Sequence, residues 1–169
     1  MRLKSRFLFF LIQVVFFCFA SSLLLVSCDK KRVFDEYKSV GKSWHKDSIV
    51  SFDLPKIDTS KPYDLFLNLR SNNDYSFNNI FLIVSLEQPD KKIKVDTLEY
   101  QMANPDGTLL GEGFTDVKES KLYYKERMKF KSGNYKIHIK QAVRTTGKIS
   151  GVDKLDGITD VGFRIEKID

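Results

Sequence analysis

Cysteine and histidine are scarce in this sequence, which excludes several kinds of chemistry. The two cysteines, Cys18 and Cys28, lie near the N-terminus, so residues 29–169 can form no disulfide and contain no thiol nucleophile. The two histidines, His45 and His138, have no partner at the spacing of a metal site. A domain of this length needs no such crosslinks, because it can bury an apolar core of its own.

The sequence also lacks a strong excess of one charge and the common catalytic motifs. It carries 28 basic and 22 acidic residues, and three of the basic residues, Arg2, Lys4 and Arg6, lie before a long apolar run. Without those three the net charge is only +3, so we expect no nucleic-acid partner. Because no glycine-rich phosphate loop, nucleophile elbow or paired metal-binding motif is present, we expect no metal, no cofactor and no enzymatic activity.

The one long apolar run, residues 7–26, follows the basic N-terminus and is typical of a secretory signal. It is also long enough to span a bilayer, so an uncleaved membrane anchor is the alternative. Lipoprotein processing acylates a cysteine thiol and cuts before it, with a small residue at Ser27 and an aliphatic one at Leu25. We therefore predict a lipoprotein signal peptide over residues 1–27, cleavage between Ser27 and Cys28, and anchoring in membrane lipid through acylated Cys28.

The pattern after the cleavage site divides the mature chain into two parts. Residues 28–46 are mostly polar, and we interpret them as a lipidated N-terminus and tether. Lys30, Lys31 and Arg32 in this part are consistent with attraction to anionic headgroups or with a solvated linker. Trp44, the only tryptophan, is predicted to pack into the core of the domain formed by residues 47–169.

From residue 49 onward, apolar and polar residues alternate with the period of β-strands. The segment 80–86 is apolar on both faces and is predicted to lie in the middle of a sheet or beneath a covering element. Seven or eight such short segments, separated by turn signals, predict an all-β fold, an antiparallel β-sandwich of jelly-roll or immunoglobulin-like topology.

Two polar segments are long for connections in such a sandwich. Residues 71–79 are rich in asparagine, and residues 144–157 contain three glycines and are interpreted as a long mobile loop. The exposed face of one predicted strand carries Tyr123, Lys125, Arg127 and Lys129. These cations could receive an acidic partner, but we interpret them as residues that discourage pairing at a sheet edge. We therefore expect recognition to use the two polar loops. The hypothesis is that Tyr75 and Phe77 are aromatic anchors for a partner.

Several stretches of the mature chain carry a family resemblance. They are residues 63–70 (YDLFLNLR), 79–86 (NIFLIVSL), 96–100 (DTLEY), 113–119 (GFTDVKE) and 157–165 (GITDVGFRI). Together with the cleavage motif and Trp44, they resemble the gliding-motility lipoprotein H family (GldH) of Bacteroidota.

This resemblance implies a non-enzymatic envelope lipoprotein of the gliding apparatus, linked to type IX secretion, with other gliding and secretion envelope proteins as partners. We expect it at the periplasmic face of the outer membrane. The alternative is a glycan-binding β-sandwich lipoprotein of a polysaccharide-uptake system, with Tyr75 and Phe77 exposed as sugar platforms.

Overall fold

The computed structural model describes residue 13, residues 29–113 and residues 116–168. The signal peptide and the lipidation site were expected at residues 1–27 and at Cys28, and apart from Gln13 they lie outside these residues. The contacts between residues divide the chain into two units, Met1–Lys30 and Lys31–Asp169. Every strand found among the described residues belongs to the second unit. Within the described part of the chain, no helix combines the length and apolar character needed to cross a bilayer.

The described residues of the second unit form ten β-strands connected by loops and turns. They are β1 (Arg32–Ser39), β2 (Ser43–His45), β3 (Val50–Asp53), β4 (Pro62–Ser71), β5 (Asn79–Glu87), β6 (Ile93–Gln101), β7 (Lys118–Lys129), β8 (Lys136–Gln141), β9 (Lys154–Asp156) and β10 (Ile158–Lys167). The predicted all-β class is confirmed.

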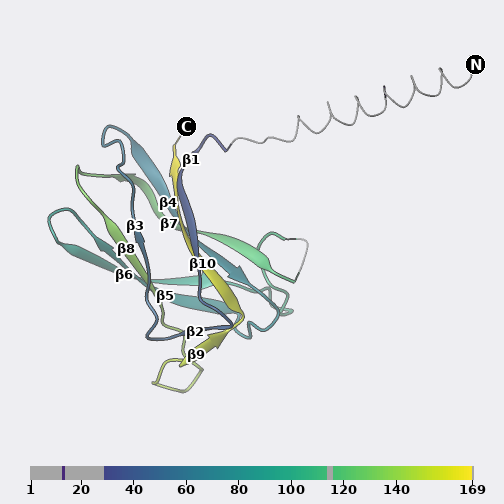
Figure 1. The fold of residues 1–169 in the computed structure, drawn as a ribbon. Helices are drawn as coiled ribbons and strands as arrows, with labels where there is room; N and C mark the ends of the chain where they lie inside the picture. The colour runs from purple at the N-terminus through teal and green to yellow at the C-terminus, as the bar shows by residue number, and fades with distance from the viewer. Residues whose placement is uncertain (1–12, 14–28, 114–115, 169) are drawn as a thin grey trace, which may run out of the picture. The chain divides into compact units, whose positions relative to one another are not determined.

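Two four-stranded antiparallel sheets form the sandwich (Figure 1). The first has the order β1-β10-β4-β7 and the second the order β3-β8-β5-β6, while β2 and β9 form a separate small sheet. Consecutive strands mostly alternate between the two large sheets, and β5 and β6 alone form a hairpin of sequence neighbours in them. This order is that of an eight-stranded jelly roll, which decides between the two topologies that the sequence left open.

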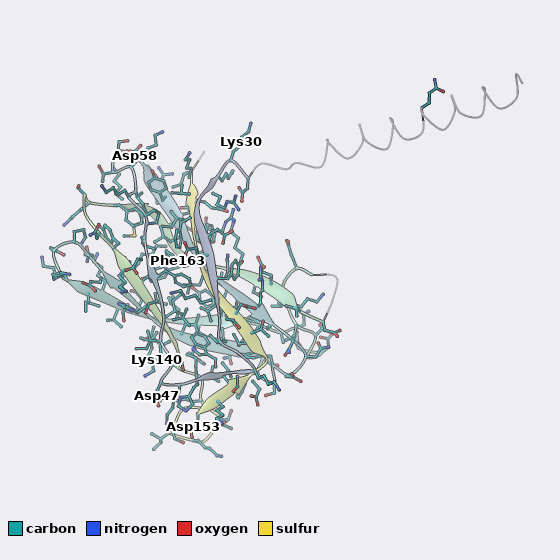
Figure 2. The ribbon with its side chains drawn as sticks, viewed as in Figure 1. Lys30, Asp47, Asp58, Lys140, Asp153 and Phe163 are labelled. Atoms are coloured by element: carbon teal, nitrogen blue, oxygen red, sulfur yellow. The ribbon has the colours of Figure 1, made fainter. Side chains whose placement is uncertain are left out.

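The core lies between the two large sheets and follows the predicted alternation. On β5, the buried residues Ile80, Leu82, Val84 and Leu86 alternate with less buried neighbours, and β5 is an inner strand as predicted. Phe163 of β10 lies near the centre of the domain (Figure 2), where its ring meets Phe34 and Tyr124. Burial of such large side chains is the main favourable contribution to the folding of this domain.

The prediction that residues 28–46 form a tether is wrong for most of that segment, because residues 32–39 and 43–45 form strands of the domain. Strand β1 pairs with β10 from Arg32 to Ser39, and its Phe34 lies in the core. Strand β2 pairs with β9, and Trp44 is fully buried, as predicted for its indole. Because β1 is an edge strand with one buried aromatic residue, its sequence has too few apolar positions to show a strand pattern.

The strands run between two ends of the sandwich, which we call proximal and distal. The proximal end contains the start of β1, the loops at residues 54–61 and 130–135, the hairpin at 88–92 and the end of β10. The distal end contains the connections at residues 40–49, 72–78, 102–117 and 142–157. Asp58 marks the proximal end in Figure 2, whereas Asp47, Lys140 and Asp153 mark the distal end.

Candidate functional site

The two polar loops predicted to bind a partner meet at the distal end. Together with the start of the connection between β6 and β7, they surround an open hollow of about 880 Å³. Amide and hydroxyl side chains dominate its lining, with one carboxylate, one guanidinium and one aromatic ring. The lining residues are Ser76, Phe77, Asn78, Asn79, Glu99, Gln101, Ala103, Asn104, Pro105, Arg144, Thr145 and Thr146. We refer to this feature as the distal hollow.

The first loop, residues 72–78, is held by its own turn chemistry. The Asn72 Oδ1 atom accepts a hydrogen bond from the Asp74 backbone at 3.0 Å, and the Asn72 carbonyl accepts one from the Tyr75 backbone at 3.0 Å. The Asn72 backbone N–H donates to the Gly157 carbonyl at 2.8 Å, which ties this loop to the segment that precedes β10. Asparagine favours such turns because its side chain replaces a backbone acceptor.

Gly157 allows the two segments to approach closely. Its φ angle is +81°, and a Cβ atom there would lie 2.1 Å from the Tyr75 backbone nitrogen. Both the left-handed backbone and the contact exclude a side chain at this position. The wall of the distal hollow formed by residues 72–78 is therefore fixed by a glycine from a distant part of the sequence.

The expectation that Tyr75 is an exposed anchor is wrong. Its side chain is 5% exposed and belongs to the core cluster, and its hydroxyl donates to the Asn79 carbonyl at 2.7 Å. Burial also raises the pKa of the Tyr75 hydroxyl. Phe77 is partly buried, with its ring 6.0 Å from the Tyr75 ring, and it lines the hollow. The two rings therefore form no exposed platform for a sugar.

The second predicted loop, residues 144–157, is shorter than expected because it contains β9. Leu155 of β9 is fully buried and pairs with Trp44 across the small sheet. The buried Gln141 side chain fixes the loop base, since its Nε2 donates to the Val152 carbonyl at 2.7 Å and its Oε1 accepts from the Val143 backbone at 3.0 Å. The continuously exposed part of this segment is residues 144–150.

The charged groups of the hollow come from different segments. Glu99 of β6 accepts a hydrogen bond from Asn79 of β5 at 2.5 Å, whereas Arg144 extends from the base of the second loop and is exposed. This combination of neutral hydrogen-bonding groups with one charge of each sign is suited to a polar surface on another macromolecule.

A second polar cluster, on the outer face of the first large sheet, was missed by the sequence analysis. Arg164 of β10 donates to Asp35 of β1 at 2.6 Å and to Glu166 at 2.5 Å, and Lys121 of β7 donates to Glu166 at 2.7 Å. Burial opposes ionisation of Glu166, but the hydrogen bonds from Lys121 and Arg164 hold its pKa below the usual range. The alternation of polar residues along β1 and β10 indicates that these strands have a polar outer face. It does not show which charged side chains on that face form ion pairs with each other.

The same face contains a further hydrogen-bond network that joins β1 to β4 and β7. The Asn68 amide donates to the Tyr37 hydroxyl at 2.9 Å and to Asp35 at 3.3 Å, and the Tyr37 hydroxyl donates to Glu119 at 2.7 Å. Gly162 of β10 makes room for the Tyr37 ring, since a Cβ atom there would lie 2.8 Å from it. These contacts attach the edge strand β1 firmly to its sheet.

Each histidine has an identified partner within the domain. His138 shares a 2.7 Å hydrogen bond with Ser51 across β8 and β3, and His45 lies 3.7 Å from Asp47. Across residues 29–113 and 116–168, no group of three His, Cys, Asp or Glu side chains is placed to hold a metal ion.

Comparison with known proteins connects this fold to a family. The sequence model described as GldH lipoprotein matches residues 32–165, which is most of the chain and runs from the start of β1 into β10. The chain belongs to the GldH lipoprotein family. The family resemblance seen in the sequence is thereby confirmed.

Two GldH relatives show how far the similarity extends. The chain is 72% identical over 149 residues to the gliding motility lipoprotein GldH of Flavobacterium johnsoniae, covering 88% of this chain and 93% of that protein. It is 56% identical over 156 residues to a gliding motility lipoprotein GldH homolog of Christiangramia forsetii, covering 92% and 96%. In both cases the similarity extends over nearly the full length of the relative.

A solved structure of a family GH115 4-O-methyl-alpha-glucuronidase is similar to this GldH chain with a TM-score of 0.42 and 11% sequence identity. The similar region covers 84% of this chain and 18% of the glucuronidase. At that level of similarity, nothing about activity follows for the GldH domain.

Proposed function

We propose that this protein is a non-enzymatic, lipid-anchored component of a gliding apparatus, located at the periplasmic face of the outer membrane. The observation that carries the proposal is the similarity to the gliding motility lipoprotein of Flavobacterium johnsoniae over 93% of its length. In this proposal, acylated Cys28 anchors the protein, and its partners are other gliding and type IX secretion envelope proteins.

The position of Cys28 relative to the fold supports an anchoring role. The folded unit begins at Lys31, so only Asp29 and Lys30 separate the acylation site from it. Several acyl chains on one residue hold a protein on a bilayer far more firmly than a single myristoyl chain does. The protein would act as a fixed element of the envelope.

The distal hollow is proposed as the surface that receives the protein partner. Loops on a rigid sandwich are the usual location of binding residues, and both walls of this hollow are held by buried groups. Phe77 supplies an apolar contact, whereas Arg144 and Glu99 supply charges that set orientation. The glycan-binding alternative is not retained, because buried Tyr75 leaves no paired aromatic platform.

Complementation tests the proposed function. The gene for this chain is introduced into Flavobacterium johnsoniae that lacks its own GldH, and colony spreading and single-cell movement are recorded. We expect the natural chain to restore movement and Cys28→Ser to fail, since the uncleaved precursor would lack the lipid that holds the protein in the outer membrane. A natural chain that is acylated and abundant but restores no movement would contradict the proposal.

Variants of the distal hollow test the docking surface in the same cells. Phe77→Ser combined with Arg144→Glu should abolish movement and a crosslink to a gliding or secretion envelope protein, without changing acylation. Because Phe77 is partly buried against Tyr75, the melting temperature should fall, and thermal melting shows that the variant is still folded at the growth temperature. Ile149→Ser is the control, because Ile149 is 91% exposed at the second loop and does not line the hollow. Unchanged movement in the folded double variant would place the docking surface elsewhere.

A further inference from the structure

The two ends of the sandwich differ in charge. The proximal segments, residues 31–32, 53–64, 87–94, 126–136 and 166–168, contain twelve basic and seven acidic residues. The distal segments, residues 38–49, 70–79, 99–119 and 140–160, contain nine basic and ten acidic residues. The whole positive excess of the folded unit therefore lies at the proximal end.

The proximal end is also the end nearest to the acylation site in the chain. Lys31 is three residues beyond Cys28, and three extended residues reach at most about 11 Å. This reach is of the same order as the Debye length of about 8 Å at physiological ionic strength, so the end of the domain where β1 begins is the end whose charges can interact with the headgroups. The tether that the sequence analysis predicted would have allowed the domain to move much further away.

The distal end lies beyond that range. The eight residues of β1 span the sandwich, and at about 3.3 Å per residue they separate its two ends by about 25 Å. Screening at this distance removes most of the attraction between distal charges and headgroups. Only the proximal end therefore has both the charge and the position to interact with a membrane surface.

We propose that the proximal end is a docking surface for anionic phospholipid headgroups, which sets the domain upright with the distal hollow facing away from the bilayer. This end carries three exposed lysines from two of its segments, Lys61 just before β4, and Lys129 and Lys131 at and after the end of β7. Their ammonium groups supply charge that is independent of the lipid on Cys28. The upright orientation of the domain rests on the proposed acylation of Cys28. The affinity of the proximal end for anionic headgroups does not depend on it.

A lipid-free chain tests the headgroup affinity. A chain that begins at Asp29 contains every strand and the whole core, so it retains the fold. We expect it to float with vesicles of phosphatidylcholine and phosphatidylglycerol at low salt and not with phosphatidylcholine alone. The triple variant with Lys61→Glu, Lys129→Glu and Lys131→Glu should bind at least about tenfold more weakly, given the contribution of each basic residue near an anionic surface.

The matched control reverses three exposed lysines of the distal end, with Lys42→Glu, Lys148→Glu and Lys154→Glu. It changes the net charge by the same amount, so it should retain nearly all of the vesicle binding. An equal loss of vesicle binding in the two triple variants would overturn the proposed docking surface. The proposal would also be overturned if the natural chain did not bind anionic vesicles. Thermal melting shows whether each variant is folded, and none of these outcomes bears on gliding.

The acylated protein tests the orientation. Because lipid occupies Cys28, either Ser132→Cys at the proximal end or Ser150→Cys at the distal end introduces a single reactive thiol. A fluorophore at position 132 should be strongly quenched by headgroup-attached quenchers, and one at position 150 should not. Equal quenching at the two positions, or stronger quenching at position 150, would overturn the upright arrangement.

Discussion

Replacing Trp44 by alanine should destabilise the domain strongly, although Trp44 lies in a strand of only three residues. Its indole is fully buried, and its Nε1 donates to the Ser48 carbonyl at 2.9 Å. Truncating a buried tryptophan costs about 3–5 kcal/mol, because transfer free energy is lost and a cavity remains. The stability of a whole domain is only about 5–15 kcal/mol, so a large share would be lost.

The assay is thermal unfolding of the chain that begins at Asp29, followed by far-ultraviolet circular dichroism. For a domain of this size, a loss of 3–5 kcal/mol lowers the melting temperature by about 10–20 °C. Trp44→Phe is the control, since it keeps much of the volume and removes the hydrogen bond, which contributes about 1 kcal/mol. If the alanine variant melts within a few degrees of the natural chain, the reasoning from burial is refuted.

Three further predictions follow from particular contacts. Gly157→Ala should destabilise the domain by more than about 2 kcal/mol in a denaturant titration, because it adds a clash with Tyr75 to the strain of a positive φ angle. Gly147→Ala is the control, because Gly147 has a similar φ angle and no neighbour within 4 Å. It shows the effect of the strain alone and should destabilise the domain less. The hydrogen bond from Lys125 holds the pKa of Asp96 below its usual range. The ionised Asp96 carboxylate therefore stabilises the folded domain at pH values above its unfolded pKa, and this stabilisation is lost as the pH falls through its folded pKa. Asp96→Asn should therefore reduce the acid-induced fall in melting temperature, and an unchanged pH profile would contradict this attribution. Cys28→Ser should abolish palmitate labelling and leave an uncleaved precursor, whereas persistent labelling would argue against acylation at Cys28.

The inner strands could be predicted because their local patterns agree with their environments. The alternation along β4, β8 and β10 shows which face of each strand enters the core, and the doubly apolar run of β5 indicates an inner position. A period of two is a property of the backbone and needs no knowledge of the partner strand. The burial of Trp44 was also predicted correctly, since moving a large apolar side chain out of water is favourable.

The candidate site was predicted only in part, because its geometry depends on distant segments. The sequence indicated two polar loops, and they do share the distal hollow. It could not show that Gly157 fixes the backbone at Tyr75, which turns a loop aromatic residue into a core residue. Strand β9 was missed for a similar reason, since one buried leucine makes a strand only when β2 pairs with it.

The amino-acid sequence by itself determined the all-β class, the faces of the inner strands, the family and the prediction that Cys28 carries lipid, because these depend on local period and short motifs. Only the tertiary structure decided the jelly-roll order, the inclusion of β1 and β2 in the domain, and the meeting of the two loops. It also placed the excess of positive charge at the end nearest to Cys28 in the chain. These features depend on which distant strands pair, and antiparallel pairing over long separations leaves little trace in either strand alone.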